Sequence, residues 1–284
     1  MDENHVHLGE YDFATIQPCS AIAIVGKRRS GKSNTGIFLV SSCLPRTRRY
    51  MAICGNKESK AEWSRVFPVA CVFEKDTGPL EKLKSYQDKK AEGGPIDPKY
   101  WVTVVLDDCG SDKAFMYAPV LVDILANGRH YGIRILILIQ YFVQLHPQNR
   151  SQLDYAAVLF CNNDNLTKRI HTEFAPQIPF QAFKTVLSVA TEARGALWLD
   201  NTAHVQQGTD ISNMSLLRVP FVDPVPMDLQ TLRQVADRRV PYNPKPSHQK
   251  TNSRDSKGGD SEGEMPVHGT GRRFVFHGNK LTVL

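Results

Sequence analysis

Long hydrophobic runs are missing from this chain of 284 residues. Its longest apolar stretch, residues 133–139, has only the length of a strand and contains Arg134, whereas about 18–20 apolar residues are needed to span a bilayer. Residues 1–5 also lack the basic and apolar regions of a signal peptide. We therefore expect a soluble protein that is not secreted and has no membrane partner.

Paired cysteines of the CxxC type are missing as well. Most of the cysteines stand in or beside apolar stretches, and the set comprises Cys19, Cys43, Cys54, Cys71, Cys109 and Cys161. This placement favours reduced core thiols, in a cytosolic or nuclear compartment, over a disulfide framework or a zinc site.

A strong excess of one charge is also absent. The formal net charge is +6, which permits a nucleic-acid partner without requiring one. Basic residues gather at residues 27–29 and again at Arg46, Arg48 and Arg49. Such clusters are most often solvated faces, so charge alone does not decide whether the chain contacts DNA.

The most informative feature present is a complete phosphate-binding loop, GKRRSGKS, at residues 26–33. Its glycines let successive backbone N–H groups point at phosphate oxygens, and the helix that follows adds a positive dipole. In this pattern Lys32 reaches the β- and γ-phosphates and the Ser33 hydroxyl ligates Mg²⁺. We therefore predict a nucleoside triphosphate site that uses Mg²⁺ and is made of Gly26, Lys27, Arg28, Arg29, Ser30, Gly31, Lys32, Ser33 and Asn34.

Apolar runs of strand length alternate with amphipathic segments along most of the chain. The predicted strands are residues 21–25, 50–54, 69–73, 102–106, 133–139, 156–160 and 196–199. The predicted helices are residues 32–43, 57–66, 79–90, 114–127, 163–173 and 179–189. This alternation is typical of an α/β fold whose mainly parallel sheet is flanked by helices.

Composition divides the chain into three parts. Residues 1–18 form an N-terminal extension, residues 19–242 an ATPase domain and residues 243–284 a tail. Residues 243–270 are rich in Ser, Gly, Pro, Asp and Lys and hold few large apolar side chains, so we expect them to be disordered. The apolar residues 272–276 and 281–284 are expected to form either a short docking peptide or an added strand.

The second part of the nucleotide site follows the apolar run at residues 102–106. Two carboxylates, Asp107 and Asp108, come directly after this run. A carboxylate at the end of a strand beside the phosphate loop can hold Mg²⁺, directly or through water. We assign Asp107 to the metal and Asp108 to orienting the attacking water or acting as general base.

The same residues spell the D-x-x-G pattern of GTPases, so guanine specificity has to be tested. A GTPase should carry an N-K-x-D motif after a later strand. The pair Asn56-Lys57 precedes Asp107 and lacks the aspartate, and residues 161–164 lack the lysine. Order and content therefore both argue against a GTPase and leave ATP as the expected nucleotide.

The strand predicted at residues 133–139 ends in Gln140. In P-loop ATPases with an additional strand between the loop strand and the Mg²⁺ strand, this central strand presents a polar side chain to the γ-phosphate. We therefore assign Gln140 as the sensor of that phosphate.

Taken in order, GKRRSGKS, VTVVLDDCG and GRHYGIRILILIQ resemble the FtsK/HerA superfamily over about residues 20–200. Within it the chain is most similar to the genome-packaging ATPases of poxvirus-type large DNA viruses, virophages and Mavericks. The resemblance implies a RecA-like core and ring assembly, often as a hexamer. It also implies ATP hydrolysis coupled to translocation of double-stranded DNA into a capsid, with a capsid or portal protein as partner. The expected location is then the virion or the nucleus or cytoplasm of the host cell.

In this superfamily an arginine ahead of the sensor strand acts on the γ-phosphate of the neighbouring subunit. Arg129 matches that position, and Arg134 is the alternative. Two departures stand out: Asp108 replaces the glutamate of many relatives, and Arg28 and Arg29 stand where small residues are common.

Two other functions stay open from the sequence. A helicase or conjugative pump would bind single-stranded DNA by stacking, for which residues 141–142 are candidates. A P-loop kinase of a small metabolite would need an arginine-rich lid, and no obvious lid is seen in the sequence.

Overall fold

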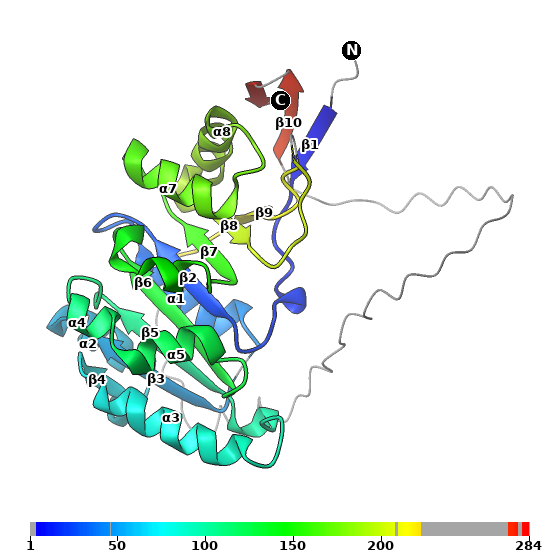
Figure 1. Cartoon of the computed structure of the whole chain (residues 1–284). Coiled ribbons are helices and arrows are strands. Elements are labelled where there is room, and N and C mark those ends of the chain that lie inside the picture. The colour runs from blue at the N-terminus through cyan, green and yellow to red at the C-terminus, as the bar shows by residue number, and fades with distance from the viewer. Residues whose placement is uncertain (1–3, 46, 208–209, 223–271, 278–279, 284) are drawn as a thin grey trace, which may run out of the picture.

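The computed structural model describes residues 4–45, 47–207, 210–222, 272–277 and 280–283. Its centre is an eight-stranded sheet in the order β4-β3-β5-β6-β2-β7-β8-β9 (Figure 1). The strands are β2 (Ala21–Val25), β3 (Arg49–Cys54), β4 (Val72–Glu74), β5 (Val102–Asp107), β6 (Ile133–Ile139), β7 (Tyr155–Val158), β8 (Ala196–Asp200) and β9 (Met214–Leu217). Arg46 and the segment expected to be disordered, residues 243–270, lie outside the described residues.

The six strands from β4 to β7 are parallel, whereas β8 and β9 are antiparallel to their neighbours. The predicted mainly parallel sheet is therefore confirmed. Strand β6 pairs with β5 on one side and with β2 on the other, which is the additional-strand arrangement that the sequence predicts. The carboxyl ends of these three strands consequently meet at one edge of the sheet.

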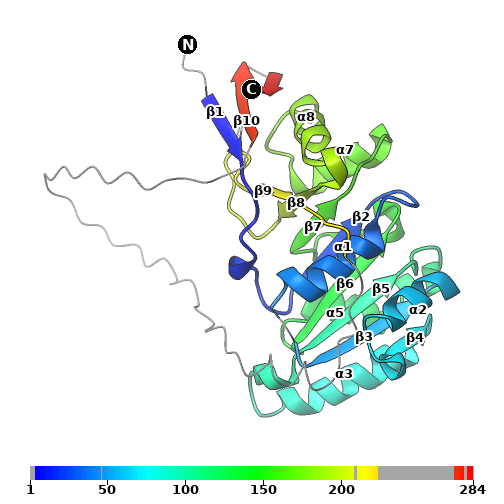
Figure 2. The same cartoon turned by 180° about the vertical axis from the view of Figure 1, so that it is seen from behind.

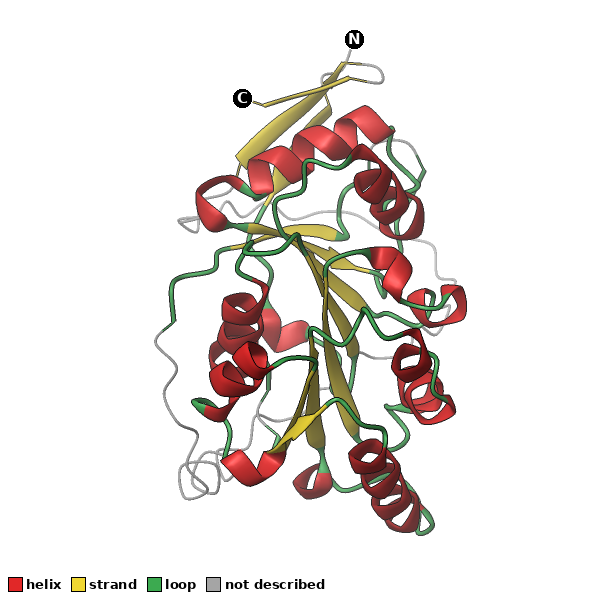
Figure 3. Ribbon diagram, turned by 90° about the vertical axis from the view of Figure 1, so that its left-hand side faces the viewer, coloured by secondary structure: helices red, strands yellow, loops and turns green. Residues whose placement is uncertain are grey.

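Helices cover both faces of this sheet (Figure 3). They are α1 (Lys32–Phe38), which continues as a π-helical turn over Leu39–Cys43, α2 (Lys57–Ser64), α3 (Gly78–Ala91), α4 (Lys113–Met116), α5 (Pro119–Asn127), α6 (Pro147–Arg150), α7 (Asp164–Phe174) and α8 (Phe180–Ala190). Short 3₁₀ turns lie at Phe13–Thr15, Val69–Cys71, Pro98–Tyr100, Phe142–Gln144 and Glu192–Arg194.

Burial on both faces explains why the central strands read as continuous apolar runs. Along β2, Ala21, Ala23 and Val25 belong to the core that also contains residues of α3, α5, α7 and α8. Ile22 and Ile24 face the other way, into the core formed with α1 and α2. The side-chain period of two thus divides one strand between two hydrophobic layers.

The structure differs from the predicted elements in several places, and β1 and α6 are among the elements that were not predicted. The helix predicted at residues 114–127 is interrupted at residues 117–118 because Pro119, which lacks an N–H group, begins a new helix. The strand predicted at residues 69–73 begins as a 3₁₀ turn, and only Val72–Glu74 pairs with β3. The strand β9 was not predicted; it pairs with β8 at the edge of the sheet.

A second, three-stranded sheet combines the two ends of the chain (Figures 1 and 2). Here β1 (Asn4–Leu8) pairs with β10 (Arg272–His277), which pairs with β11 (Lys280–Val283), all antiparallel. The Gly9 carbonyl, directly after β1, accepts a backbone hydrogen bond of 2.7 Å from the Leu216 N–H, and this bond connects β1 to β9. The apolar segments at the end of the sequence thus form strands. In the part of the chain that is described, no helix has the length and apolar character needed to cross a membrane.

Candidate nucleotide-binding and catalytic site

The phosphate loop connects β2 to α1 at the carboxyl edge of the sheet. The Gly26 N–H donates to the Ile139 carbonyl at 3.1 Å, which fastens the loop to the end of β6. Arg29 and Gly31 both have left-handed backbones, with φ of 62° and 93°. Such turns gather N–H groups into a concave anion-binding surface. Because Gly31 caps α1 without a side-chain hydrogen bond, the first N–H groups of that helix can receive phosphate oxygens.

Lys32 is folded back over this loop. Its ammonium donates to the Lys27 carbonyl at 3.0 Å. Burial lowers the pKa of Lys32, and the nearby carboxylates of Asp107 and Asp108 act in the opposite direction. The two carboxylates thus favour the charged form that a triphosphate would attract.

Asp107, the last residue of β5, is only 3% exposed. Its Oδ2 accepts hydrogen bonds from the Ser33 hydroxyl at 3.0 Å and from the Trp63 indole N–H at 2.9 Å. Burial raises the pKa of Asp107, and these two hydrogen bonds oppose that rise. The sequence places Ser33 and Asp107 in a metal site, and the structure brings their oxygens together.

The donor set fits Mg²⁺. A hydroxyl and a carboxylate are hard oxygen ligands, and Mg²⁺ usually completes its shell with phosphate oxygens and water. Within the described residues, no group of three or more His, Cys, Asp or Glu side chains offers a protein-only metal cage. Ser33 and Asp107 are the residues that would hold the ion beside a bound triphosphate.

Asp108 turns away from Asp107, since its backbone is left-handed with φ of 57°. Its Oδ1 accepts a hydrogen bond of 3.3 Å from the Gln140 amide, and its Oδ2 accepts one from the Asn56 amide. A Cβ at Gly55 would lie 1.9 Å from the Asp108 carbonyl oxygen. The end of β3 therefore approaches the Asp108 turn so closely that only glycine fits there.

Two contributors to this site, Asn56 and Trp63, were not assigned from the sequence. Asn56 follows β3 and caps α2 by accepting from the Ser59 N–H at 2.8 Å. A polar residue close to the end of a predicted strand was the available signal, although Gly55 separates Asn56 from that strand, whereas Gln140 follows its strand directly. For Trp63 there was no comparable signal, because its contact with Asp107 depends on how α2 lies on the sheet.

The remaining loop residues have different surroundings. Lys27, Arg28 and Arg29 are exposed, and the Lys27 ammonium lies 5.0 Å from the centre of the Phe160 ring. The side-chain amide of Asn34, a residue predicted to bind nucleotide, makes two contacts within the protein: it donates to the Pro220 carbonyl at 3.0 Å and accepts from the Val222 N–H at 3.1 Å. It thereby fixes residues 220–222 beside the start of α1.

No family model matches the chain. An uncharacterised protein of Invertebrate iridescent virus 6 is 28% identical over 228 residues, which cover 78% of this chain and 86% of that protein. An uncharacterised protein of Frog virus 3 (isolate Goorha) is 29% identical over 188 residues, 64% of this chain and 56% of that protein.

Among solved structures, ATPases 2 and 3 of EssC from Geobacillus thermodenitrificans align with a TM-score of 0.50 at 14% identity, over 84% of this chain and 48% of that chain. At this identity the alignment shows a shared fold, a mainly parallel α/β sheet flanked by helices as in P-loop NTPases. The genome-packaging NTPase B204 of Sulfolobus turreted icosahedral virus 2, in complex with ATP-γS, aligns with a TM-score of 0.48 at 15% identity, over 73% of this chain and all of that chain.

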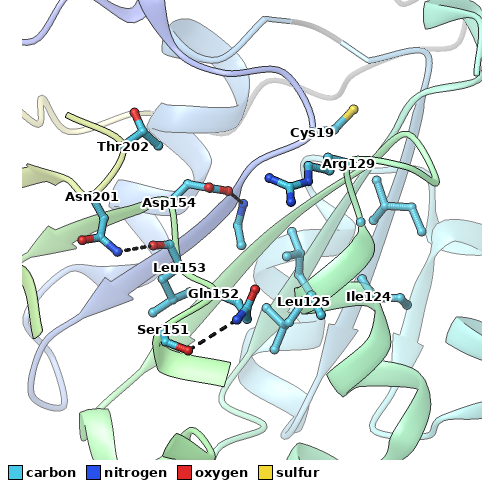
Figure 4. Close-up of a pocket in the computed structure, with 15 residues that line it drawn as sticks. Cys19, Ile124, Leu125, Arg129, Ser151, Gln152, Leu153, Asp154, Asn201 and Thr202 are labelled. Atoms are coloured by element: carbon cyan, nitrogen blue, oxygen red, sulfur yellow. Dashed lines mark hydrogen bonds between the residues drawn. The ribbon is translucent and has the colours of Figure 1, made fainter. Parts of the chain in front are cut away.

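In this P-loop ATPase fold, Arg129 lies far from the phosphate loop of its own chain. It precedes β6, whereas Gln140 follows it, and seven residues of strand span about 23 Å. Arg129 is exposed and, together with Asp154, lines a cavity of about 300 Å³ at the amino edge of the sheet (Figure 4). Arg129 thus lies too far from the phosphate loop of its own chain to contact a nucleotide bound there.

The alternative arginine, Arg134, is only 1% exposed. It donates to the Pro45 carbonyl at 2.6 Å, just after the π-helical turn that ends α1, and burial lowers the pKa of its guanidinium. A cation suits the carbonyl-rich end of a helix. This contact is internal, which argues against Arg134 as a residue that reaches a neighbouring subunit.

Proposed function

We propose that this protein is an ATP-driven translocase of double-stranded DNA that packages a viral genome into a capsid. The observation that carries the ATPase part is the convergence of Lys32, Ser33, Asp107, Asp108 and Gln140 at the carboxyl ends of β2, β5 and β6. This set contains a cation that can bind phosphate, a pair of oxygens that can hold a metal, and a partly exposed carboxylate held by two side-chain amides. It suits hydrolysis of a nucleoside triphosphate.

Each residue of this set has a separate role, determined by its position in the site. Lys32 and the N–H groups of the loop bind the β- and γ-phosphates, and Ser33 and Asp107 hold Mg²⁺. When bound, Mg²⁺ neutralises the charge that develops on the phosphates. Asp108 orients the attacking water after exchanging one of its two amide contacts for it. Gln140, hydrogen-bonded to Asp108, donates its amide to the γ-phosphate and so connects phosphate binding to the position of that carboxylate.

DNA translocation and capsid binding, the other two parts of the proposal, are supported by sequence resemblance and not by the geometry of the site. The ordered motifs resemble those of viral packaging ATPases, and the sequence relatives are proteins of large viruses. We infer a ring, often hexameric in this superfamily, in which Arg129 of one subunit completes the site of the next. A guanidinium stabilises phosphoryl oxygens in a bidentate manner. A capsid or portal protein would anchor the ring, in the virion or in the nucleus or cytoplasm of the host cell.

The test is the ATPase rate of the purified protein and of Lys32→Ala, with and without long duplex DNA, at two salt concentrations. We expect the substitution to lower turnover at least about 100-fold, because it removes a preorganised charge from the phosphates. Duplex DNA should raise the wild-type rate, and high salt should abolish that rise, since backbone contacts release counterions.

Other outcomes point elsewhere. Greater stimulation by single strands than by duplex would favour a helicase or conjugative pump. Turnover that ignores all nucleic acid, from a protein that sediments as a monomer or dimer, would contradict a translocase and favour a P-loop kinase.

A further inference from the structure

Three cations lie against two tyrosine rings at the amino end of β3. The Arg49 guanidinium is 4.8 Å from the Tyr86 ring centre and 5.7 Å from that of Tyr100. The Lys90 ammonium is 4.7 Å from Tyr100 and 5.5 Å from Tyr86, and that of Lys99 is 5.0 Å from Tyr100. These residues come from β3, the carboxyl-terminal half of α3 and the 3₁₀ turn Pro98–Tyr100. We call these five residues the basic–aromatic cluster.

The positive charge of this cluster is largely uncompensated. Among the described residues, neither Arg49 nor Lys90 has a carboxylate partner within 4 Å, and only Lys99 has one, Asp97 at 2.9 Å. Arg49 and Lys90 are exposed, and so is the neighbouring Lys89, whereas the two tyrosines are partly buried. A neutral ring attracts a cation without cancelling its charge. The tyrosines therefore fix the positions of the charges and leave them able to attract an anion.

This arrangement fits a phosphate backbone. An arginine fork and nearby ammonium groups on a preorganised surface match closely spaced phosphate oxygens. The cations already cover faces of the two tyrosine rings. The rings therefore hold the cations in place and are less free to stack on unpaired bases. Contacts of this kind are made to the phosphate backbone and not to the bases, as binding to a duplex requires because its bases are stacked inside.

The location allows nucleotide and DNA to bind together. Strand β3 begins at Arg49 and ends at Cys54, beside Asp107 of β5. Six residues of strand span about 20 Å, so the cluster lies at the edge of the sheet opposite the phosphate loop. The same strand leads directly to Asn56, which contacts Asp108.

We propose that the basic–aromatic cluster is the surface that contacts the phosphate backbone of double-stranded DNA. The inference rests on the proposed function, since it assigns the surface through which a translocase would grip its duplex. It assigns neither the nucleotide site nor the ring interface.

The test uses the full chain and the double variant R49A/K90A. Its matched control is K168A/R169A, which removes one lysine and one exposed arginine from α7, at the other end of the molecule (Figure 1). Affinity for a fluorescently labelled duplex is measured by anisotropy over a range of salt. Each lost phosphate contact reduces the slope of log K against log salt by about 0.9, so we expect a reduction of about 2 in R49A/K90A and none in the control.

Two further measurements separate this inference from a general loss of function. The charge-retaining variant R49K/K90R should restore most of the slope, and ATP turnover without DNA should stay at the wild-type level in all three variants. An unchanged slope in R49A/K90A, or an equal reduction in the control, would overturn the assignment of this surface. If wild-type protein shows Lys32-dependent turnover but no affinity for duplex, both the proposed translocase function and the assignment of this surface are overturned.

Discussion

Adjacent carboxylates on one strand end have opposite environments in this protein. Asp107 is buried and bonded to Ser33 and Trp63, whereas Asp108 is partly exposed and held between two side-chain amides. The left-handed backbone of Asp108 separates them, because it turns the second side chain away from the first. In the proposed mechanism, the environment of each carboxylate, more than the residue type, therefore separates metal binding from water orientation.

This division predicts different defects for the two isosteric substitutions. Asp107→Asn removes a charge from the metal site, so Mg²⁺-dependent affinity for a fluorescent ATP analogue should fall about 10-fold or more. Asp108→Asn should leave that affinity within about twofold but lower turnover about 100-fold or more, since the water loses its oriented acceptor. Binding titrations and steady-state ATPase rates measure the two effects. Equal losses of affinity in both variants would contradict the division.

At the scale of elements, the site depends on how closely the ends of β3 and β5 approach. The Gly55 N–H donates to the Asp107 carbonyl at 2.8 Å, and a side chain at Gly55 would overlap the Asp108 carbonyl oxygen. Gly55→Ala should therefore displace the Asp108 turn, cost about 1–3 kcal/mol of stability and lower turnover at least about 10-fold. Nucleotide affinity should change less, because the phosphate loop lies on another strand.

The matched control is Gly93→Ala, since a Cβ at Gly93 meets no atom within 4 Å. Thermal melting and ATPase rates of both variants decide the outcome. Turnover in Gly55→Ala equal to that in Gly93→Ala would show that the approach of β3 to β5 has no role in positioning Asp108.

The elements that the sequence predicts well are those with long, uniform signals. Strands β2, β5 and β6 are largely apolar on both faces, and a glycine or a polar residue marks the end of each, so their predicted bounds agree with the structure to within a residue. The contact of Asn56 with Asp108 was not predictable in the same way. It requires β3 to lie beside β5, and the order of strands in a sheet is a tertiary property that local patterns do not contain. Strand β9 was missed for the related reason that its four residues carry too short a pattern.

At the scale of the whole molecule, β6 separates two functional ends. Gln140 follows its carboxyl end at the phosphate loop, and Arg129 precedes its amino end at the cavity it shares with Asp154. A single chain cannot bring both residues to one phosphate without breaking the strand. In a ring with head-to-tail contacts, by contrast, each interface joins one end of a subunit to the opposite end of its neighbour.

Mixing two inactive variants tests this arrangement. Lys32→Ala retains Arg129 but cannot bind the phosphates, and Arg129→Ala retains the phosphate loop but lacks the guanidinium. Each alone should hydrolyse ATP at least about 100-fold more slowly than wild type. After the subunits are mixed in equal amounts and allowed to exchange, about a quarter of the interfaces should pair an intact loop with an intact arginine, and turnover should recover to about that fraction. An arginine that acts within its own subunit would give no recovery, because neither variant then holds a complete site. An arginine without a catalytic role would instead leave Arg129→Ala active before mixing.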